Sequence, residues 1–195
     1  MIIRNFKTSD IEKAKGLSHL VWGDFYKKEN IEVQKLIYDF TVDFYDLNRE
    51  LSYSVLDENE NCKGFLFAFN KKDENDSSDI LINTVKTLKN EKDKNILFEL
   101  YKFLHYCGTR TKKYMNENDI MLGLFVSIQK GCGKILLEKL TQGCKKKDIK
   151  NMYLWSDTTC DYDYYSKNDF ELIDKAKVVL NNQEVIVFVY RKSLL

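Results

Sequence analysis

The sequence lacks the residues that mark metal-binding and disulfide-stabilised proteins. It has only two histidines and no proline, and the absence of proline says little about function. The five cysteines are an odd number, they form no C-x-x-C pair, and no histidines cluster near them. This pattern argues against a metal site and against a disulfide scaffold, so we expect no bound metal.

Neither an excess of one charge nor a long apolar run is present. Lysine and arginine number 31 and aspartate and glutamate 30, which leaves a net charge of +1 and no global field that favours nucleic acid or an anionic membrane. No apolar run approaches the roughly 20 residues of a membrane span. The start, MIIRNFKTSD, lacks the charged-then-apolar layout of a secretion signal. We expect a cytoplasmic protein without a nucleic-acid or membrane partner.

What the sequence does have is enough apolar material for one core. The chain has 195 residues, of which 44% are hydrophobic, so we expect a single domain spanning residues 1–195. Period-two and helical patterns follow one another along the chain. They predict an α/β (α+β) fold with about seven strands and about four to six helices.

One stretch organises the chain, from Asp119 to Lys134, with the sequence DIMLGLFVSIQKGCGK. The nearly continuous apolar residues Ile120 to Val126 predict a strand buried on both faces, because a half-exposed strand alternates polar and apolar residues. Gly131 and Gly133 stand just before a helical pattern, where backbone amides can converge at the positive end of a helix. This arrangement suits a phosphate, and a plain reversal of the chain is the alternative.

The spacing of this loop excludes two common phosphate-binding motifs. A Walker motif ends in Gly-Lys-Ser/Thr after a longer loop, and the dinucleotide fingerprint needs three glycines with an acidic residue roughly 20 positions later. Further along, residues Tyr164 to Phe170 read YYSKNDF. This segment resembles the F-Y-x-K-x-G-F signature of the GNAT superfamily of acyl-CoA-dependent N-acetyltransferases, in which it follows a loop of the form R/Q-x-x-G-x-G/A. The two segments stand in the family's order.

The resemblance implies a fold, a co-substrate and an activity. The implied fold is a GNAT-like mixed, mostly antiparallel sheet flanked by helices, here with a helical insertion at about residues 78–115 before the cofactor-binding strand. The implied co-substrate is acetyl-CoA, and the implied reaction is direct transfer of its acetyl group to a primary amine. In the family the tyrosine of the second motif often protonates the departing thiolate. The matching residue is Tyr165, which we therefore expect to be the general acid.

The resemblance also indicates which residues bind the cofactor. The loop would hold the pyrophosphate through backbone amides, with Lys130 and Lys134 adding positive charge. The end of the preceding strand would present backbone groups to the pantetheine arm, and one amide there could polarise the thioester carbonyl. The implied cofactor-binding residues are Leu124, Phe125, Val126, Gln129, Lys130, Gly131, Cys132, Gly133 and Lys134.

Two residues depart from the family pattern. Ile128 stands where the family prefers Arg or Gln, although Gln129 is next to it, and the change is mild because backbone amides make most phosphate contacts. Asp169 replaces a glycine and must accept a turn conformation, which Asp tolerates better than most residues. Cys132 lies at the expected helix start, where its thiol pKa should fall. We favour a small residue filling the loop interior over a reactive nucleophile.

The other elements follow from shorter patterns. Ser9 and Glu12 form a capping-box pattern that should begin a first helix, and a second helix is expected at residues 31–45. The insertion should contain two helices with a break at residues 90–92, acting as a lid, a partner surface or a cover for the sheet. Strands are expected at residues 2–6, 51–56, 62–69, 151–157, 171–180 and 184–190, with a tight hairpin turn at residues 181–183.

The resemblance places the acceptor amine beside the first two helices. Their aromatic residues either shape a substrate pocket or pack in the core; they are Trp22, Phe25, Tyr26, Tyr38 and Tyr45. The base that deprotonates the amine is a water chain or one of three carboxylates near strand ends, Glu117, Asp119 and Asp157. The acceptor is a small-molecule or peptide amine, and a homodimer is one option for the oligomeric state.

Two alternatives remain from the sequence. The first is a non-catalytic acyl-CoA-binding sensor or partner-binding module on the same fold, which the departures at Ile128 and Asp169 motivate. The second is a plain α/β domain without a coenzyme A site, which requires both motif matches to be accidental. Steady production of free coenzyme A with an amine would argue against the first of these.

Overall fold

The chain folds around one mixed sheet. The computed structural model of the protein describes residues 1–73 and 77–194. Within them, seven strands lie in the order β1-β2-β3-β4-β5-β7-β6. The strands are β1 (Ile2–Asn5), β2 (Tyr53–Leu56), β3 (Cys62–Asn70), β4 (Ile120–Ser127), β5 (Asn151–Asp157), β6 (Glu171–Leu180) and β7 (Gln183–Ser193). All neighbouring strands are antiparallel except the pair β4 and β5. The expected mostly antiparallel sheet is confirmed.

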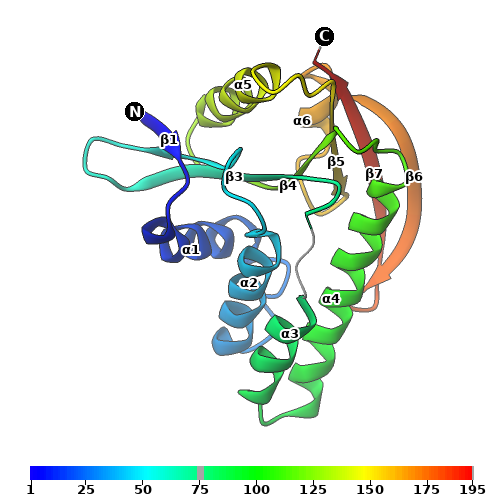
Figure 1. Ribbon diagram of the computed structural model, residues 1–195. Helices are drawn as coiled ribbons and strands as arrows, with labels where there is room; N and C mark the ends of the chain where they lie inside the picture. Colours follow the sequence, from blue (N-terminus) through cyan, green and yellow to red (C-terminus); the bar gives the residue numbers. More distant parts are fainter. Residues whose placement is uncertain (74–76, 195) are drawn as a thin grey trace.

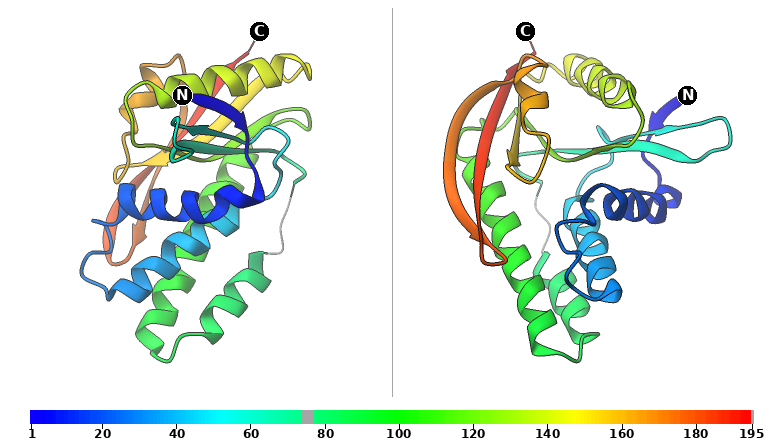
Figure 2. Two further views of the ribbon diagram at one scale, coloured as in Figure 1. Left: turned by 90° about the vertical axis from the view of Figure 1, so that its left-hand side faces the viewer. Right: turned by 180° about the vertical axis from the view of Figure 1, so that it is seen from behind.

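Helices cover both faces of this sheet. They are α1 (Ile11–Trp22), α2 (Ile31–Tyr45), α3 (Ser77–Lys86), α4 (Glu91–Lys112), α5 (Cys132–Lys145) and α6 (Asp163–Ser166). Figures 1 and 2 show α5 on one face of the sheet and α1 and α2 on the other, with α4 running alongside β5 and β6. In the described part of the chain, none of the helices has both the length and the apolar character that a membrane span requires.

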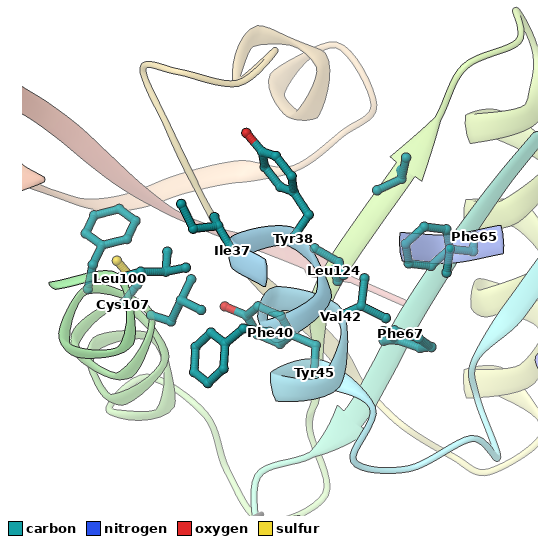
Figure 3. Close-up of a cluster of buried hydrophobic side chains, with 14 of the residues drawn as sticks. Ile37, Tyr38, Phe40, Val42, Tyr45, Phe65, Phe67, Leu100, Cys107 and Leu124 are labelled. Atoms are coloured by element: carbon teal, nitrogen blue, oxygen red, sulfur yellow. The ribbon is translucent and has the colours of Figure 1, made fainter. Parts of the chain in front are cut away.

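The middle strands are buried on both faces, which explains their unbroken apolar sequences. On β3, Phe65 and Phe67 pack into the cluster formed with α1, α2 and α4, whereas Leu66 and Ala68 pack against α5. Figure 3 shows part of the first cluster, in which α2 side chains lie between α4 and Phe65 and Phe67 of the sheet. Removing this apolar surface from water from both sides is the main stabilising contribution to the fold.

Strand β4 exchanges its two faces at a β-bulge. Phe67 pairs with Leu124 and Ala68 with Leu122, so Gly123 is the extra residue on β4. Before the bulge, Met121 faces the helices α1, α2 and α4; after it, Leu124 does. Because side chains alternate along a strand, one inserted residue inverts the pattern. The bulge therefore sets which β4 side chains face α5.

The first helix begins differently from the capping-box prediction, which was wrong. A 3-10 turn at Thr8–Asp10 precedes α1, and Ser9 makes no capping hydrogen bond. Instead, the buried carboxylate of Asp10 accepts hydrogen bonds from the Lys7 backbone N–H at 3.0 Å, from Arg4 at 2.7 Å and from the Ser54 hydroxyl at 3.1 Å. This carboxylate satisfies the start of the helix and ties it to β1 and β2.

The helical insertion forms the two expected helices, α3 and α4, but the break between them lies at residues 87–90 rather than 90–92. Asn90 is the N-cap of α4, and its side chain accepts a hydrogen bond from the Lys92 backbone N–H at 2.9 Å. The apolar face of α4 packs into the core, and Arg110 pairs with Asp174 of β6 at 2.6 Å. The long helix α4 is therefore a fixed cover for the sheet rather than a loosely held lid.

Two turns use left-handed backbone conformations where the sequence predicted tight turns. Asn181 and Asn182 join β6 and β7 with φ angles of 48° and 60°, as a two-residue hairpin turn requires. Asp169 adopts φ 64°, so it accepts the conformation that its position demands. Strand bounds differ modestly from the predictions: β2 begins at Tyr53 rather than residue 51, and β7 runs on to Ser193.

We expect Gly123→Ala to destabilise the protein. The added Cβ would lie 2.6 Å from Cδ1 of Tyr45 and closer still to the Phe69 ring, both of which are buried. Overpacking of this kind costs about 1–3 kcal/mol, and each kcal/mol lowers the Tm by about 2–4 °C in a chain of this length. The matched control is Gly16→Ala in α1, where a Cβ has nothing within 4 Å. Calorimetry showing an unchanged Tm for Gly123→Ala would contradict the bulge geometry.

Candidate active site

A cavity opens where β4 and β5 separate. The two parallel strands pair only at Ile120 with Met152 and at Met121 with Tyr153. Beyond these pairs β4 stays with β3, and β5 stays with β7. The gap holds a cavity of about 800 Å³ that is lined by β4, the loop after it, α6, the end of β5 and the helices α1, α2 and α4. Elements from all parts of the chain therefore meet at one place.

The loop between β4 and α5 presents a group of unpaired backbone amides. Gly131 is the N-cap of α5 and adopts φ 89°, which glycine takes without strain. In the described part of the chain, five N–H groups that border the cavity have no acceptor; they belong to Gln129, Lys130, Gly131, Gly133 and Lys134. A helix start also carries a partial positive charge, so this loop is suited to hold an anion.

Gly133 keeps the first turn of α5 close to its neighbours. A Cβ at this residue would lie 3.1 Å from Cζ of Phe125 and 3.2 Å from the hydroxyl of Tyr164. The Tyr164 hydroxyl is buried and has no hydrogen-bond partner among the described residues. A side chain larger than glycine would therefore push α5 away from β4 and α6 and shift the amides that point into the cavity.

The free side of β4 borders the cavity. Residues 124–126 pair with residues 65–67 of β3, but on the opposite side β4 has no strand partner beyond Met121. A strand offers N–H and C=O groups to both sides, so this stretch has backbone groups available to an extended ligand. Leu124, Phe125 and Val126 all line the cavity.

Tyr165 lies on α6 and lines the same cavity. Its ring packs edge-to-face on Phe170 at 5.7 Å and lies tilted against Tyr190 at 5.5 Å, which fixes its orientation. Burial raises the pKa of the Tyr165 hydroxyl, so the group keeps its proton at neutral pH.

Cys132 lies apart from the other residues expected to bind the cofactor. It is fully buried in the cluster beneath α5, does not line the cavity, and its backbone N–H donates to the Gln129 carbonyl at 3.1 Å. Burial raises the pKa of its thiol more than the positive charges of the chain N-terminus and Lys63 lower it, so the expected lowering of that pKa was wrong. The interpretation of Cys132 as a small residue filling the loop interior fits this position.

The structure separates the three carboxylates that the sequence could not distinguish. Glu117 is exposed and lies outside the cavity lining. Asp119 is buried but is occupied by the Asn116 backbone N–H at 2.7 Å and the Asn151 amide at 2.9 Å. Asp157, at the end of β5, is only 4% exposed and lines the cavity. It is the carboxylate that a ligand in the cavity would meet.

Asp157 is buried without a positive partner. Its Oδ1 accepts hydrogen bonds from the Thr159 backbone N–H at 2.7 Å and from the Thr159 hydroxyl at 2.6 Å, and it joins none of the ion pairs of the described residues. Burial raises the pKa of Asp157, and the Thr159 hydrogen bonds offset only part of this effect. Burial is the main cause that raises the pKa of Tyr26 and of Cys107, and the negative charge of Asp157 adds to both, after Tyr38 in the case of Tyr26. Among the described residues, no positively charged side chain therefore neutralises the Asp157 carboxylate.

The aromatic residues of the first two helices and their connection serve both roles that the sequence allowed. All five border the cavity, while Tyr26, Tyr38 and Tyr45 are also part of the buried core. Sequence reasoning missed two cavity-lining residues, Phe103 of α4 and Trp155 of β5, which pack edge-to-face at 5.5 Å. The apolar stripe predicted for this helix, Ile96, Leu97, Leu100, Tyr101 and Leu104, did not include Phe103, and nothing local indicated that α4 contacts β5.

The structure brings together most of the residues that the sequence singled out. Eight of the nine expected cofactor-binding residues line the cavity, and so does Tyr165; Cys132 is the exception. Residues of the loop, the free side of β4, Tyr165 and Asp157 thus border one cavity. Such a site can hold an anionic, extended ligand at one end and an amine at the other.

Comparison with known proteins identifies the fold. No protein-family model and no curated protein sequence matches this chain. Solved structures do match over nearly the whole length. SsHAT superposes with a TM-score of 0.69 at 11% identity, covering 100% of this chain and 98% of the other. The C-terminal condensation domain of Ebony in complex with beta-alanyl-dopamine gives 0.67 at 13% identity, covering 98% of both chains.

A third similar structure is that of an aminoglycoside 6'-N-acetyltransferase complexed with coenzyme A, with a TM-score of 0.59 at 12% identity, covering 100% of this chain and 98% of the other. The solved structures that match are of the GNAT type, so the chain has the GNAT fold. At such low identities the likeness shows the fold alone.

We expect Asp157→Asn to raise the Tm at about pH 7. The amide oxygen can still accept from Thr159, and the substitution removes a buried, unpaired charge. Because the folded-state pKa of Asp157 is raised, the native state binds its proton more tightly than the unfolded chain does. The ionised carboxylate therefore costs stability above its unfolded pKa of about 3.9, and the cost grows as the pH rises through the folded pKa.

The measurement is calorimetric Tm from about pH 3 to about pH 8, with the stabilisation expected to shrink toward the acid end. Glu117→Gln is the matched control, since its side chain is 77% exposed and its removal should leave the Tm unchanged. A lower Tm for Asp157→Asn at neutral pH would mean that the carboxylate has a compensating partner.

Proposed function

We propose that this protein is an acetyl-CoA-dependent N-acetyltransferase of the GNAT superfamily that transfers the acetyl group directly to a primary amine. The observation that carries the proposal is the group of five unpaired amides at the start of α5, beside the unpaired side of β4. Both features border the cavity that also holds Tyr165 and Asp157.

The loop is proposed to hold the diphosphate of acetyl-CoA. Unpaired N–H groups at a helix start bind phosphate oxygens without regard to side-chain identity, so Ile128 is no obstacle. Lys130 and Lys134 are exposed beside the cavity and add positive charge; the Lys134 ammonium lies 3.9 Å from Glu138, a pairing that a phosphate can compete with.

The pantetheine arm is proposed to lie along residues 124–126 of β4 as an added strand. Backbone N–H and C=O groups on the side of β4 that faces β5 would pair with the amides of the arm. This places the thioester in the gap between β4 and β5, where a β4 backbone N–H can polarise its carbonyl oxygen. Water is displaced from the gap as the arm enters, which strengthens that interaction.

The acceptor amine is proposed to reach the thioester from the Asp157 side. The ammonium form of the amine gives one proton to Asp157, and Asp157 passes this proton to solvent. The raised pKa of Asp157 makes it a better base than an ordinary carboxylate. As the C–N bond forms and the C–S bond breaks, Tyr165 gives its proton to the thiolate and regains one from the new amide nitrogen. The products are the acetylated amine and coenzyme A.

The non-catalytic alternative has less support than the sequence suggested. Its motivation was the departure of Ile128 and Asp169 from the family pattern. Asp169 adopts the left-handed conformation that its position needs, and the Ile128 backbone N–H is bonded to the Lys63 carbonyl at 3.0 Å. Neither residue disturbs the loop or α6, so the structure provides no observation that favours a silent site.

We expect acetyl-CoA to raise the Tm of the protein and Gly131→Ala to reduce that effect. A ligand at 100 times its Kd stabilises by about 2.7 kcal/mol. A Cβ at Gly131 meets nothing within 4 Å, so alanine would act only by straining the φ of 89° and moving the amides. The measurement is a thermal-shift titration of the wild-type protein and Gly131→Ala with acetyl-CoA, and Gly16→Ala is the control. An undiminished shift in Gly131→Ala would place coenzyme A elsewhere.

We expect Tyr165→Phe to lower kcat by about 10²–10⁴-fold, the usual contribution of a general acid, while the acetyl-CoA thermal shift is unchanged. The ring is kept, so its packing on Phe170 and Tyr190 survives. Release of the coenzyme A thiol reports turnover. Tyr162→Phe is the control, because Tyr162 stacks on Phe188 at 4.7 Å outside the cavity lining. Equal turnover by Tyr165→Phe and wild type would remove the proposed role.

A further inference from the structure

Nearly all aromatic side chains of this protein are buried or half-buried, and the three that are not lie together. Phe98, Tyr106 and Tyr114 are 39%, 40% and 42% exposed, and every other Phe, Tyr and Trp side chain is less exposed. All three belong to α4 or to the turn that follows it, and they are spaced eight residues apart. Exposed aromatic side chains that share one surface mark a site of interaction with another molecule.

The three aromatic residues lie on one row of α4 side chains. Residues four apart form rows on a helix surface, and we call this row the α4 ridge; its members are Phe98, Lys102, Tyr106, Arg110 and Tyr114. Figure 1 shows α4 along the outer side of the molecule, next to β6. The Arg110 guanidinium lies 6.0 Å from the centre of the Tyr106 ring, and its Nη2 donates to the Asp174 carboxylate of β6 at 2.8 Å. Contacts with β6 therefore hold the ridge in place.

The charges on and beside the α4 ridge are close to balanced. Glu99 and Lys113 are exposed beside it, and among the described residues neither forms an ion pair. Arg110 is paired with Asp174, so Lys102 is the remaining cation of the ridge. A surface with so little net charge has no strong field that would attract nucleic acid, an anionic membrane or a highly acidic protein.

The α4 ridge is also symmetric about its middle residue, Tyr106. Phe98 precedes Tyr106 by eight residues, and Tyr114 follows it by eight. Glu99 precedes Tyr106 by seven residues, and Lys113 follows it by seven. A two-fold axis requires a surface that complements itself, so that residue i faces residue j and residue j faces residue i. Aromatic residues and opposite charges at equal distances from one centre meet this requirement.

We propose that two copies of the chain associate through their α4 ridges in an antiparallel dimer whose two-fold axis passes beside Tyr106. Tyr106 packs against Tyr106 of the partner subunit. Phe98 packs against Tyr114 of the partner subunit, and Glu99 pairs with Lys113 of the partner subunit. Each of the last two contacts occurs twice, because the symmetry repeats it on the other side of the axis. The dimer does not depend on the proposed acetyl transfer.

The remaining charges on this side of the molecule fit the same arrangement. Lys102 faces Arg110 of the partner subunit, whose charge Asp174 already balances, so two uncompensated cations do not meet. The neighbouring strand β6 is at the edge of the sheet and carries the exposed side chains of Lys175 and Lys177. Lysines on an edge strand oppose pairing with a strand of another molecule. Self-association is therefore directed to the helix face and not to the sheet edge.

The first test measures the mass of the protein by sedimentation equilibrium from about 5 µM to about 500 µM. A single pair of helices lies at the small end of interface sizes, so we expect a dissociation constant in the micromolar range. The mass should rise from 23.1 kDa toward twice this value as the concentration increases. A mass that stays at 23.1 kDa over the whole range overturns the proposal and leaves the ridge for a different protein.

The second test exchanges the two charges beside the ridge. Glu99→Lys places lysine opposite lysine at both ends of the interface, so it should raise the dissociation constant of the dimer about tenfold or more, and Lys113→Glu should do the same. The double variant Glu99→Lys/Lys113→Glu should restore the dimer. Glu12→Lys is the matched control, because its side chain is 82% exposed on α1, away from α4. A dimer that the single variants leave unchanged, or that the double variant fails to restore, contradicts the arrangement.

The third test locates the two-fold axis by disulfide cross-linking. Packed helices lie about 8–10 Å apart, so the two copies of a residue beside the axis come within reach of a disulfide, and Tyr106→Cys should cross-link under oxidation. Phe98→Cys is the control, because its two copies lie about 24 Å apart along the helices. Four of the five native cysteines are buried, and the wild-type protein gives the background. Non-reducing electrophoresis that shows faster cross-linking of Phe98→Cys than of Tyr106→Cys overturns the inference.

Discussion

The separation of β4 from β5 is the constraint on which the rest of the structure depends. In most sheets a parallel neighbour satisfies the backbone groups of its partner along the whole strand. Here the pairing stops at Met121 and Tyr153, and both strands continue with other partners on their outer sides. Unpaired backbone groups and a gap between two strands are therefore built into the sheet. The loop amides and the end of β5 fall at the mouth of this gap because each follows one of the two separating strands.

The bulge at Gly123 allows β4 to separate without losing its core. Before the bulge Met121 faces α1, α2 and α4, and after it Leu124 and Val126 do. Phe125 faces α5, where it contacts Gly133. A bulge also bends and twists the strand locally, which turns its free side toward the cavity. The tight approach of Tyr45 and Phe69 leaves room only for glycine at this turn. Packing on one face and ligand access on the other are thus set by one residue.

The strands and helices were largely predictable from the sequence, because each has a strong local pattern. The bounds of β5 and β6 were predicted correctly, and Asn181 and Asn182 specified the hairpin. Features set by distant contacts were not predictable. Asp10 replaced Ser9 at the first helix start because Arg4 and Ser54 converge on it from two strands. The same holds for the site. The glycines of the loop were visible in the sequence. That Asp157 lines the cavity, whereas Asp119 accepts a hydrogen bond from the Asn151 amide, could be known only from the structure.

Among the described residues, seven buried side-chain atoms have no hydrogen-bond partner, and four of them belong to residues that line the cavity, namely Tyr26, Tyr45, Trp155 and Tyr164. Most buried polar side chains elsewhere have partners, as Asp10 and Asp119 do. Around the cavity, Asp157 has no cationic partner and the Tyr26 hydroxyl has no hydrogen bond among the described residues. Folding alone gains nothing from this arrangement, since each such group opposes it. A ligand that brings a positive charge to Asp157 removes one of these costs, so this part of the protein favours binding over stability.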